Sequence, residues 1–417
     1  MKEVGRAESQ GRQIPEMRLE ANVAILVQRI GPYHDARFRA FSKARAAMVS
    51  VIEFRPEDPV YAWTEVRETG GYHRLRTRSR TELSQALDEL RPIVLVCVGY
   101  ADPEINQAVA WALRRKAPLI TCSDSTREDE PRRRAKEALK RRMIDSFDAA
   151  LISGSRAREY LTGLGFDDRR IFRPWDVVDN GHFERGAERS RSGSASLRAH
   201  LSLPSRFFFC VARFVPKKNL AGLIDAYARY AAQAGGNAWS LVLSGGGPLD
   251  ASLRAQAAAL GVGRQVVFVG FLQHTELPKY YGLANAFVLP SNSDQWGLVV
   301  NEAMAAGLPV IVSSRCGCAR DLVDDGGNGF IFEPGVPEVL AGCLAKMARL
   351  NDEQRAAMGV RSREIIRQYS PEAFAAGLEA AIECAVASQA ARKSWLGRAL
   401  VNLAALRSIP IDHSLLL

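Results

Sequence analysis

Two short segments in the second half of the sequence combine residue types that could bind phosphate. The first is Arg213-Phe214-Val215-Pro216-Lys217-Lys218-Asn219, which follows an apolar run and precedes a helical pattern. Arg213 and Lys218, five residues apart, could hold one diphosphate, because a guanidinium binds as a fork and an ammonium as a point charge. Cations are also common after surface strands, so an ordinary surface role is the alternative for this pair.

The second segment runs from Pro290 to Pro309 and holds two carboxylates, Asp294 and Glu302, with seven residues between them. A strand pattern ends before it, and a helical pattern begins near Gly297. Glycine there would let the backbone approach a ligand, and the N–H groups that follow, with the helix dipole, favour an anion. Glu302 lies about one turn inside this apolar helix, where a carboxylate needs hydroxyl or N–H partners. A capping or ion-paired carboxylate is the structural alternative.

Several nucleotide-binding motifs are absent from the sequence. It contains no G-x-x-x-x-G-K-[ST], no G-x-G-x-x-G after its first apolar run, and no Asp-x-Asp pair. Without Asp-x-Asp, the usual carboxylate pair for a metal-bridged sugar nucleotide is missing. Positive side chains and helix ends would then hold any phosphate, so we expect neither a metal nor a cofactor.

These segments belong to a regular alternation of short apolar runs and helical patterns. Continuous apolar strands separated by helices are typical of parallel sheets that are buried on both faces. We therefore predict an α/β fold of two doubly wound, Rossmann-like domains facing a cleft, with ligands at the carboxyl ends of the strands. The predicted strands are 22–27, 49–54, 93–98, 119–122 and 149–152 in the first half, and 207–212, 239–243, 266–269, 286–289, 310–312 and 329–332 in the second.

Composition divides the chain into five parts. We predict a disordered tail at 1–20, an N-terminal acceptor-side domain at 21–184, a linker at 185–204, a C-terminal nucleotide-binding domain at 205–370, and a C-terminal helix and tail at 371–417. The linker prediction depends on a stretch rich in Arg, Ser, Gly and Ala with few large apolar residues. The end of the chain could pack on the first domain, lie on a membrane or be mobile.

Overall composition is that of an ordinary folded protein. The 417 residues are 47% hydrophobic and 24% charged, which argues against disorder, collagen-like repeats and a disulfide scaffold. No apolar run is long enough to span a membrane, and the first twenty residues lack a signal-peptide pattern, so we expect a cytoplasmic location. The seven scattered cysteines favour a reduced, structural role over a zinc site or disulfides.

The net charge of +10 is uneven, with a surplus of 7 in residues 1–200. The densest patch lies in residues 131–142, within a segment of good helix formers. One interpretation is a solvated helix face, and the other is contact with an anionic membrane surface or a lipid-linked phosphate. No nucleic-acid-binding module can be found, so no nucleic acid is expected as a partner.

Taken together, the run from Val211 to Pro309 resembles the nucleotide-binding domain of the family 4 retaining glycosyltransferases, which have the two-domain GT-B fold. The shared features are R-x4-K at 213–218, the Ser-Gly-Gly-Gly-Pro turn at 244–248, Val-Gly-Phe at 269–271, and the carboxylate-x7-Glu motif at 294–302. The similarity extends over most of the chain, more weakly before residue 205.

The resemblance implies transfer of a hexosyl group from a nucleotide diphosphate sugar to an acceptor hydroxyl, with retained anomeric configuration. Arg213 and Lys218 would bind the diphosphate, Glu302 the ribose hydroxyls, and Asp294 the hydroxyls of the donor sugar. Preorganised cations and a helix N-terminus would stabilise the leaving diphosphate, so we expect catalysis without a metal.

Five further residues belong to the predicted site. The resemblance implies that the backbone at Gly297 and Leu298 meets phosphate or sugar and that Phe271 borders the base. In the first domain, Gly31 follows the first strand and could lie over the phosphates. His34 could face the acceptor, or it could have a plain surface or capping role.

The sequence departs from the family pattern at two places. The first motif carboxylate is usually Glu, and here it is Asp294, which is one methylene shorter. Many relatives place a His in a T-x-H arrangement after the fourth first-domain strand, whereas here Thr121-Cys122 is followed by Ser123-Asp124. Asp124 could therefore face the acceptor, or it could cap a helix from Arg127 onward.

The acceptor is a separate prediction. The basic first domain supports the hypothesis of a lipid-linked saccharide in bacterial-type surface polysaccharide synthesis, with the enzyme peripheral at the inner face of the cytoplasmic membrane. Two other functions are left open. A nucleotide-sugar epimerase of the same fold would need additional acid/base groups, and the chain has only six histidines. A non-catalytic nucleotide-sugar-binding protein would not need all four motif residues.

Overall fold

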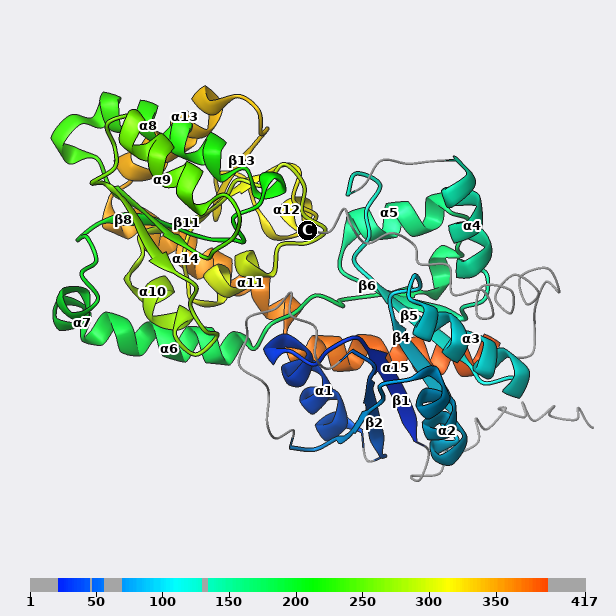
Figure 1. Cartoon of the computed structure of the whole chain (residues 1–417). Helices are drawn as coiled ribbons and strands as arrows, with labels where there is room; N and C mark the ends of the chain where they lie inside the picture. Colours follow the sequence, from blue (N-terminus) through cyan, green and yellow to red (C-terminus); the bar gives the residue numbers. More distant parts are fainter. Residues whose placement is uncertain (1–21, 46, 56–69, 130–133, 389–417) are drawn as a thin grey trace, which may run out of the picture.

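The computed structural model describes residues 22–45, 47–55, 70–129 and 134–388, and Figure 1 shows their arrangement. The predicted tail at 1–20, the end of the chain from residue 389, and the first three residues of the basic patch at 131–142 lie outside these ranges. The described residues form two parallel sheets, each covered by helices, as the alternating pattern predicts.

The N-terminal domain is built on a seven-stranded parallel sheet in the order β3-β2-β1-β4-β5-β6-β7. Its strands are β1 (Val23–Val27), β2 (Val49–Glu53), β3 (His73–Arg76), β4 (Val94–Val98), β5 (Leu119–Ser123), β6 (Ala149–Ile152) and β7 (Ile171–Phe172). The helices are α1 (Pro32–Ala44), α2 (Arg80–Leu90), α3 (Pro103–Arg115), α4 (Arg134–Ile144) and α5 (Ser155–Gly163), with a 3-10 turn, η1, at Asp168–Arg170.

The C-terminal domain repeats this plan with six parallel strands in the order β10-β9-β8-β11-β12-β13. Its strands are β8 (Phe207–Val211), β9 (Ser240–Ser244), β10 (Val266–Gly270), β11 (Ala286–Leu289), β12 (Val310–Ser313) and β13 (Gly329–Phe332). The helices are α8 (Leu220–Ala234), α9 (Asp250–Ala259), α10 (Leu277–Leu283), α11 (Leu298–Ala305), α12 (Ala319–Leu322), α13 (Pro337–Arg349) and α14 (Asp352–Ile366). Three 3-10 turns are η2 (Pro216–Lys218), η3 (Gly235–Asn237) and η4 (Arg367–Tyr369).

All eleven predicted strands are present, and their ends agree with the predicted ends to within one residue. Two strands were not predicted. Strand β3 is a polar edge strand, and its Arg74 and Arg76 bond the buried Glu53 carboxylate of β2 at 2.7 and 3.2 Å. Strand β7 has only two residues. Apolar patterning detects buried strands, so a charged edge strand and a very short one escape it.

Residues 185–204, predicted to be a linker, are largely helical. They form most of α6 (Asn180–Ser192) and all of α7 (Ser194–His200). The small residues have a packing role, because a Cβ on Gly186 would lie 2.5 Å from Pro278 of α10, and one on Gly282 would lie 2.6 Å from the Ala187 carbonyl oxygen. The composition that suggested a flexible segment therefore serves close packing of α6 against α10.

The C-terminal helix α15 (Pro371–Ser388) returns to the N-terminal domain and lies against its sheet (Figure 1). Arg45 forms an ion pair with Glu379 of α15 at 2.6 Å. A Cβ on Gly377 would lie 2.6 Å from the Arg173 carbonyl oxygen, so the helix backbone approaches the chain beyond β7 closely. One hydrophobic core cluster runs through both domains and includes α15, while two others lie on the opposite faces of the two sheets.

Candidate functional site

Asp294 lies in the loop between β11 and α11, and the loop after β12 holds it in place. The backbone of Asp294 forms a parallel bridge with Cys316, and the Gly317 N–H donates to the Asp294 carbonyl at 2.9 Å. A Cβ on Gly317 would lie 1.7 Å from the Gln295 carbonyl oxygen, so only glycine allows this approach. The contact fixes Asp294 beyond the carboxyl end of β11.

Gly297 immediately precedes α11, where a helix start was predicted. Its φ is 102°, and a Cβ there would lie 2.9 Å from the Leu289 side chain. Leu298, the first residue of the helix, is half-buried. Gly297 supplies no side-chain cap to the first N–H groups of the helix. The backbone at 297 and 298 therefore has the geometry of a helix start that can receive an anion.

Lys218 reaches Asp294 from the neighbouring strand end. It ends η2 after β8, and its ammonium forms an ion pair with the Asp294 carboxylate, with exposed fractions of 15% and 14% for the two side chains. Ser291 Oγ donates to the same carboxylate at 3.4 Å. The Asn292 N–H donates to the Lys217 carbonyl at 2.8 Å. The loops after β8 and β11 thus form one unit, which brings Lys218, predicted to bind the diphosphate, next to Asp294, predicted to bind the donor sugar.

Arg213 lies two residues beyond β8 in the same loop as Lys218 and is half-buried. Burial, together with the positive charges of Arg213 and Lys218, lowers the pKa of Lys217 between them. Three cations therefore lie close together beside Asp294. Such a concentration of positive charge favours a polyanion.

The glycine turn at 244–248 packs directly against this cationic loop. Gly245 has φ 139°, and a Cβ there would lie 1.8 Å from the Ala212 carbonyl oxygen. The Phe214 N–H donates to the Gly246 carbonyl at 2.8 Å. The turn therefore supports the segment that carries Arg213. Phe271, at the end of β10, is 45% exposed, and its contact with a base stays a prediction.

Glu302 is fully buried in α11, and two tyrosine hydroxyls donate to its carboxylate. Tyr281 of α10 donates to Oε2 at 2.7 Å, and Tyr33 of the N-terminal domain donates to Oε1. Burial raises the pKa of Glu302 to about 7, although the two hydroxyl bonds act in the opposite direction. The hydroxyl partners that a buried carboxylate requires are thus present.

Tyr33 is the site residue that the sequence analysis missed. It is the second residue of α1, two positions after Gly31, and it bonds a carboxylate 269 positions away. Nothing in its local pattern distinguishes it from a surface aromatic residue. Because of this bond, the first turn of α1, which follows the loop that carries Gly31, meets α11 directly.

His34, next to Tyr33, has the capping role that was one of its two predicted roles. Its Nδ1 accepts the Gly31 N–H at 3.3 Å at the start of α1, and its ring stacks on Phe38. Burial and the charge of Arg37 lower the pKa of His34 to about 3. A contact between this neutral imidazole and the acceptor stays a prediction.

Asp124 lies just beyond β5, near a buried ion pair. Arg37 Nη2 bonds Asp176 at 3.2 Å, and its guanidinium lies 4.3 Å from the centre of the Trp175 ring. Burial and the charge of Asp176 raise the pKa of Asp124 to about 7. The alternative prediction, that Asp124 caps a helix from Arg127 onward, is wrong, because residues 127–129 form a turn and a bend. The acceptor-facing role of Asp124 stays a prediction.

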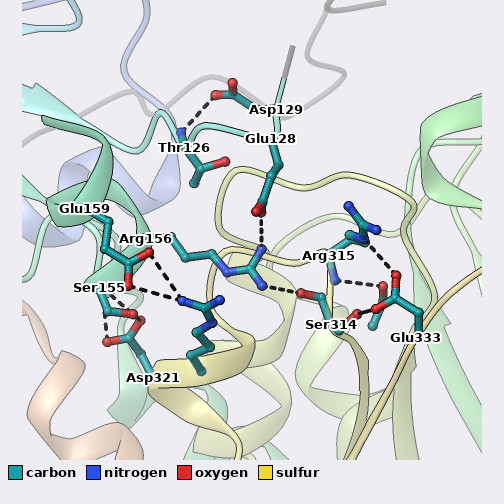
Figure 2. Close-up of polar contacts among 12 residues, drawn as sticks. Thr126, Glu128, Asp129, Ser155, Arg156, Glu159, Ser314, Arg315, Asp321 and Glu333 are labelled. Carbon is teal, nitrogen blue, oxygen red and sulfur yellow. Dashed lines mark hydrogen bonds and ion pairs between the residues drawn. The ribbon is translucent and has the colours of Figure 1, made fainter. Parts of the chain in front are cut away.

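Further polar contacts join the two domains beside this site, and Figure 2 shows three of them. Asp321 accepts the Ser155 N–H at 3.0 Å and the Ser155 hydroxyl at 2.8 Å. Arg156 Nη2 donates to the Ser314 carbonyl at 2.6 Å. The third contact is an ion pair between Arg320 and Glu159 at 3.2 Å. The start of α5 is therefore docked on the loops after β12.

The described residues contain neither a metal-type cluster nor a helix suited to span a membrane. No group of three or more His, Cys, Asp or Glu side chains in that part of the chain is placed to hold a metal ion. None of its helices is both long enough and apolar enough to cross a membrane.

The second domain matches a known family. Residues 198–365 match the family model described as glycosyl transferases group 1. The region contains the loops of Lys218 and Asp294 and all of α11. Because the match covers less than half of the chain, it describes the C-terminal domain.

Curated relatives extend the similarity. The chain is 33% identical over 194 residues to the GDP-mannose-dependent alpha-(1-6)-phosphatidylinositol monomannoside mannosyltransferase of Mycobacterium tuberculosis (strain CDC 1551 / Oshkosh), covering 44% of this chain and 49% of that one. It is 27% identical over 303 residues to the D-inositol 3-phosphate glycosyltransferase of Corynebacterium glutamicum (strain R), covering 68% and 71%. The chain spans only 24% to 49% of the length of the relatives that it matches at 33% identity or more.

A solved structure supports the whole architecture. Anabaena Alr3699/HepE in complex with UDP-glucose matches with a TM-score of 0.67 at 16% identity, covering 87% of this chain and 99% of that chain. At this identity the match establishes the fold alone. The chain thus has the two-domain GT-B fold, and its C-terminal domain carries a glycosyl transferases group 1 region.

Proposed function

We propose that this protein is a retaining glycosyltransferase that moves a sugar from a nucleotide diphosphate sugar to an acceptor hydroxyl. The observation that carries the proposal is the ion pair between Lys218 and Asp294. It joins two strand-end loops beside Arg213 and the start of α11. Phosphate-binding cations and a sugar-binding carboxylate therefore adjoin each other, as the diphosphate and the sugar do in such a donor.

Each group has a defined role in the proposed reaction. Arg213, Lys218 and the backbone at Gly297 and Leu298 would hold the diphosphate, and Asp294 would accept hydrogen bonds from the donor sugar. As the bond between the anomeric carbon and the phosphate oxygen breaks, negative charge grows on the leaving diphosphate. The fixed cations and helix dipole would stabilise that charge. Metal independence is part of the proposal.

Glu302 would bind the ribose hydroxyls of the donor. In the structure Tyr33 and Tyr281 donate to both of its oxygens. A ribose would offer the same chemical group, a hydroxyl, so donor binding exchanges one hydroxyl partner for another at the Tyr33 position. Exchange of like partners costs little free energy, because the carboxylate stays hydrogen-bonded.

The acceptor we propose is a lipid-linked saccharide in bacterial-type surface polysaccharide synthesis, with the enzyme in the cytoplasm and peripheral at the inner face of the membrane. Two observations support this part. The names of two relatives specify a phosphatidylinositol mannoside and an inositol phosphate as substrates. Helix α4 also carries four cations, Arg134, Lys136, Arg141 and Arg142, on its exposed or half-exposed surface.

The test is a panel of UDP-, GDP- and ADP-sugars, each with and without magnesium, added to the full chain during thermal unfolding. A donor at about 100 times its Kd should stabilise the protein by about 2.7 kcal/mol. The Lys218→Ala variant should lose the shift, whereas the matched Lys279→Ala change on exposed α10 surface should keep it. A shift that Lys218→Ala retains, or no shift with any donor, would contradict the proposal.

The reaction itself needs a second readout. With the donor identified, NMR of the transferred sugar shows whether the anomeric configuration is retained or inverted. Cosedimentation with phosphatidylglycerol vesicles tests the membrane contact. Binding that falls as salt is added supports electrostatic docking, and binding that salt does not change contradicts it.

A further inference from the structure

The structure contains a cavity of 960 Å³ that the donor site does not use. It lies in the N-terminal domain between α4, α5 and the loop at 126–128. Five of the residues that line it are arginines, namely Arg127, Arg134, Arg141, Arg142 and Arg156. A guanidinium offers two parallel donors to one phosphate, so an arginine-lined cavity is suited to a phosphate ligand.

Four carboxylates also line the cavity, and three of them have partners in the structure. Glu128 accepts from Arg156 Nη1 at 2.6 Å, Glu159 pairs with Arg320 from the other domain, and Glu137 accepts from the Tyr160 hydroxyl at 2.9 Å. Within the described part of the chain, exposed Arg142 makes no ion pair. The carboxylates therefore do not neutralise all the cations of the wall.

Arg156, which lines the cavity, is held by contacts with both domains. Its Nη1 and Nη2 bond Glu128 and the Ser314 carbonyl, both at 2.6 Å (Figure 2). Its Nε is buried and has no hydrogen-bond acceptor among the described residues. The two Nη bonds hold the guanidinium in place at the wall of the cavity.

The cavity also adjoins the loop that carries Asp294. Thr126, on the cavity wall, donates its N–H to Asp129, and the same carboxylate accepts from Gln295 at 3.3 Å. On the other side, Arg156 bonds Ser314, and the next carbonyl, that of Arg315, accepts the Asp294 N–H at 3.4 Å. Two wall residues of the cavity, Thr126 and Arg156, are thus linked through hydrogen bonds to the loop that carries Asp294.

We propose that this cavity binds the phosphate group of the acceptor and so presents the acceptor hydroxyl to the donor sugar. The acceptor role rests on the proposed function, whereas phosphate binding by the cavity does not. The ligand class is a phosphate ester, carried either by a soluble sugar phosphate or by a lipid head group. Arg156 and Arg142 would be its principal ligands.

The test measures binding of glycerol 3-phosphate to the full chain by calorimetry. Arg156→Gln and Arg142→Gln should each weaken binding about tenfold, which is the loss of one charge-assisted hydrogen bond. Arg142 is exposed and forms no hydrogen bond or ion pair with the other domain among the described residues, so the Arg142→Gln variant tests the cavity without removing a polar contact between the domains. Arg114→Gln, on exposed α3 surface outside the cavity, is the matched control and should bind as the wild type does.

Lys218→Ala separates this proposal from the donor site. It should leave glycerol 3-phosphate binding unchanged and weaken nucleoside diphosphate binding. The two cavity variants, Arg156→Gln and Arg142→Gln, should weaken glycerol 3-phosphate binding and leave nucleoside diphosphate binding unchanged. If only Lys218→Ala weakens glycerol 3-phosphate binding, the anion occupies the donor site and the proposal is overturned. If the wild type binds glycerol 3-phosphate but no nucleoside diphosphate, phosphate binding by the cavity is supported and the proposed glycosyltransferase function is contradicted.

Vesicles distinguish the two sources of the phosphate. Phosphatidylglycerol vesicles, compared with phosphatidylcholine vesicles, carry the same glycerol phosphate ester on a lipid. Binding to these vesicles that depends on Arg142 and Arg156 but not on Arg114 assigns a lipid-borne phosphate. Binding of the soluble ester alone assigns a soluble one. A wild-type chain that binds neither probe refutes the proposal.

Discussion

Replacing Glu302 by Gln should change how the stability of the protein depends on pH. The substitution keeps the size of a side chain that is fully buried between Tyr33 and Tyr281 and leaves one acceptor oxygen, but it replaces the other oxygen with an amide donor and removes the titratable proton. Burial raises the pKa of Glu302 from its ordinary 4.5 to about 7 in the folded protein. The folded state therefore binds a proton more tightly than the unfolded state does.

The sign and size of the effect follow from this difference. An acid with a raised folded pKa contributes stability below the unfolded value of 4.5 and loses it as the pH rises through about 7. At about 1.36 kcal/mol per pH unit, the full loss is about 3 kcal/mol. Most of this loss, about 2 to 3 kcal/mol of unfolding free energy, should separate the wild type from Glu302→Gln between pH 5 and pH 8.

Urea unfolding followed by tryptophan fluorescence measures this quantity. Trp296, one of six tryptophans, bonds Asn301, the neighbour of Glu302, at 2.9 Å, so α11 contributes to the signal. Other titrating groups cancel in the difference between the two proteins, because both contain them. A difference that is the same at pH 5 and pH 8 would refute the reasoning, since it would mean that burial does not shift the pKa of Glu302.

Three further predictions follow from the site. Tyr33→Phe removes one donor to Glu302, so the pKa of that carboxyl should rise further. The pH-dependent stability difference between Tyr33→Phe and the double variant Tyr33→Phe/Glu302→Gln should therefore have its midpoint at a higher pH than the difference between the wild type and Glu302→Gln. An unchanged midpoint would show that the bond from Tyr33 does not affect the pKa of Glu302. Lys218→Ala should lower transfer about 100-fold or more, with unfolding free energy within about 1 kcal/mol of the wild type, because it removes a partly exposed cation that stabilises the leaving group; near-normal kcat/KM would contradict its role. Gly317→Ala should lower the melting temperature and transfer together, because its Cβ would meet the Gln295 carbonyl at 1.7 Å, whereas Gly342→Ala, with open space around the Cβ, should do neither.

The strands and the loops between them could be predicted because they depend on local patterns. Buried parallel strands must be apolar along their length, so runs such as Ala286–Leu289 stand out from the helices that flank them. The loop after this strand then falls at the carboxyl edge of the sheet, whichever way the domains pack. Asp294 and Gly297 were placed correctly beyond the strand and before the helix for that reason.

The polar edge strand β3 and helix α6 were not predicted, for opposite physical reasons. Charged residues in β3 are stable because Glu53 of the next strand binds them, and this pairing is not visible in the local pattern. In α6, small residues that are typical of linkers instead allow close contact with α10. In both cases the partner that explains the composition lies elsewhere in the chain.

The sequence by itself determined two α/β domains and the residue types of the loop pair that is proposed to bind phosphate and sugar. Only the tertiary structure decided that Tyr33 meets Glu302, that α15 returns to the first domain, and that Arg156 stands between a cavity and the Asp294 loop. Helix and strand periodicity record which side of an element is buried. They do not record which distant surface covers it, because that depends on the packing of whole domains against each other.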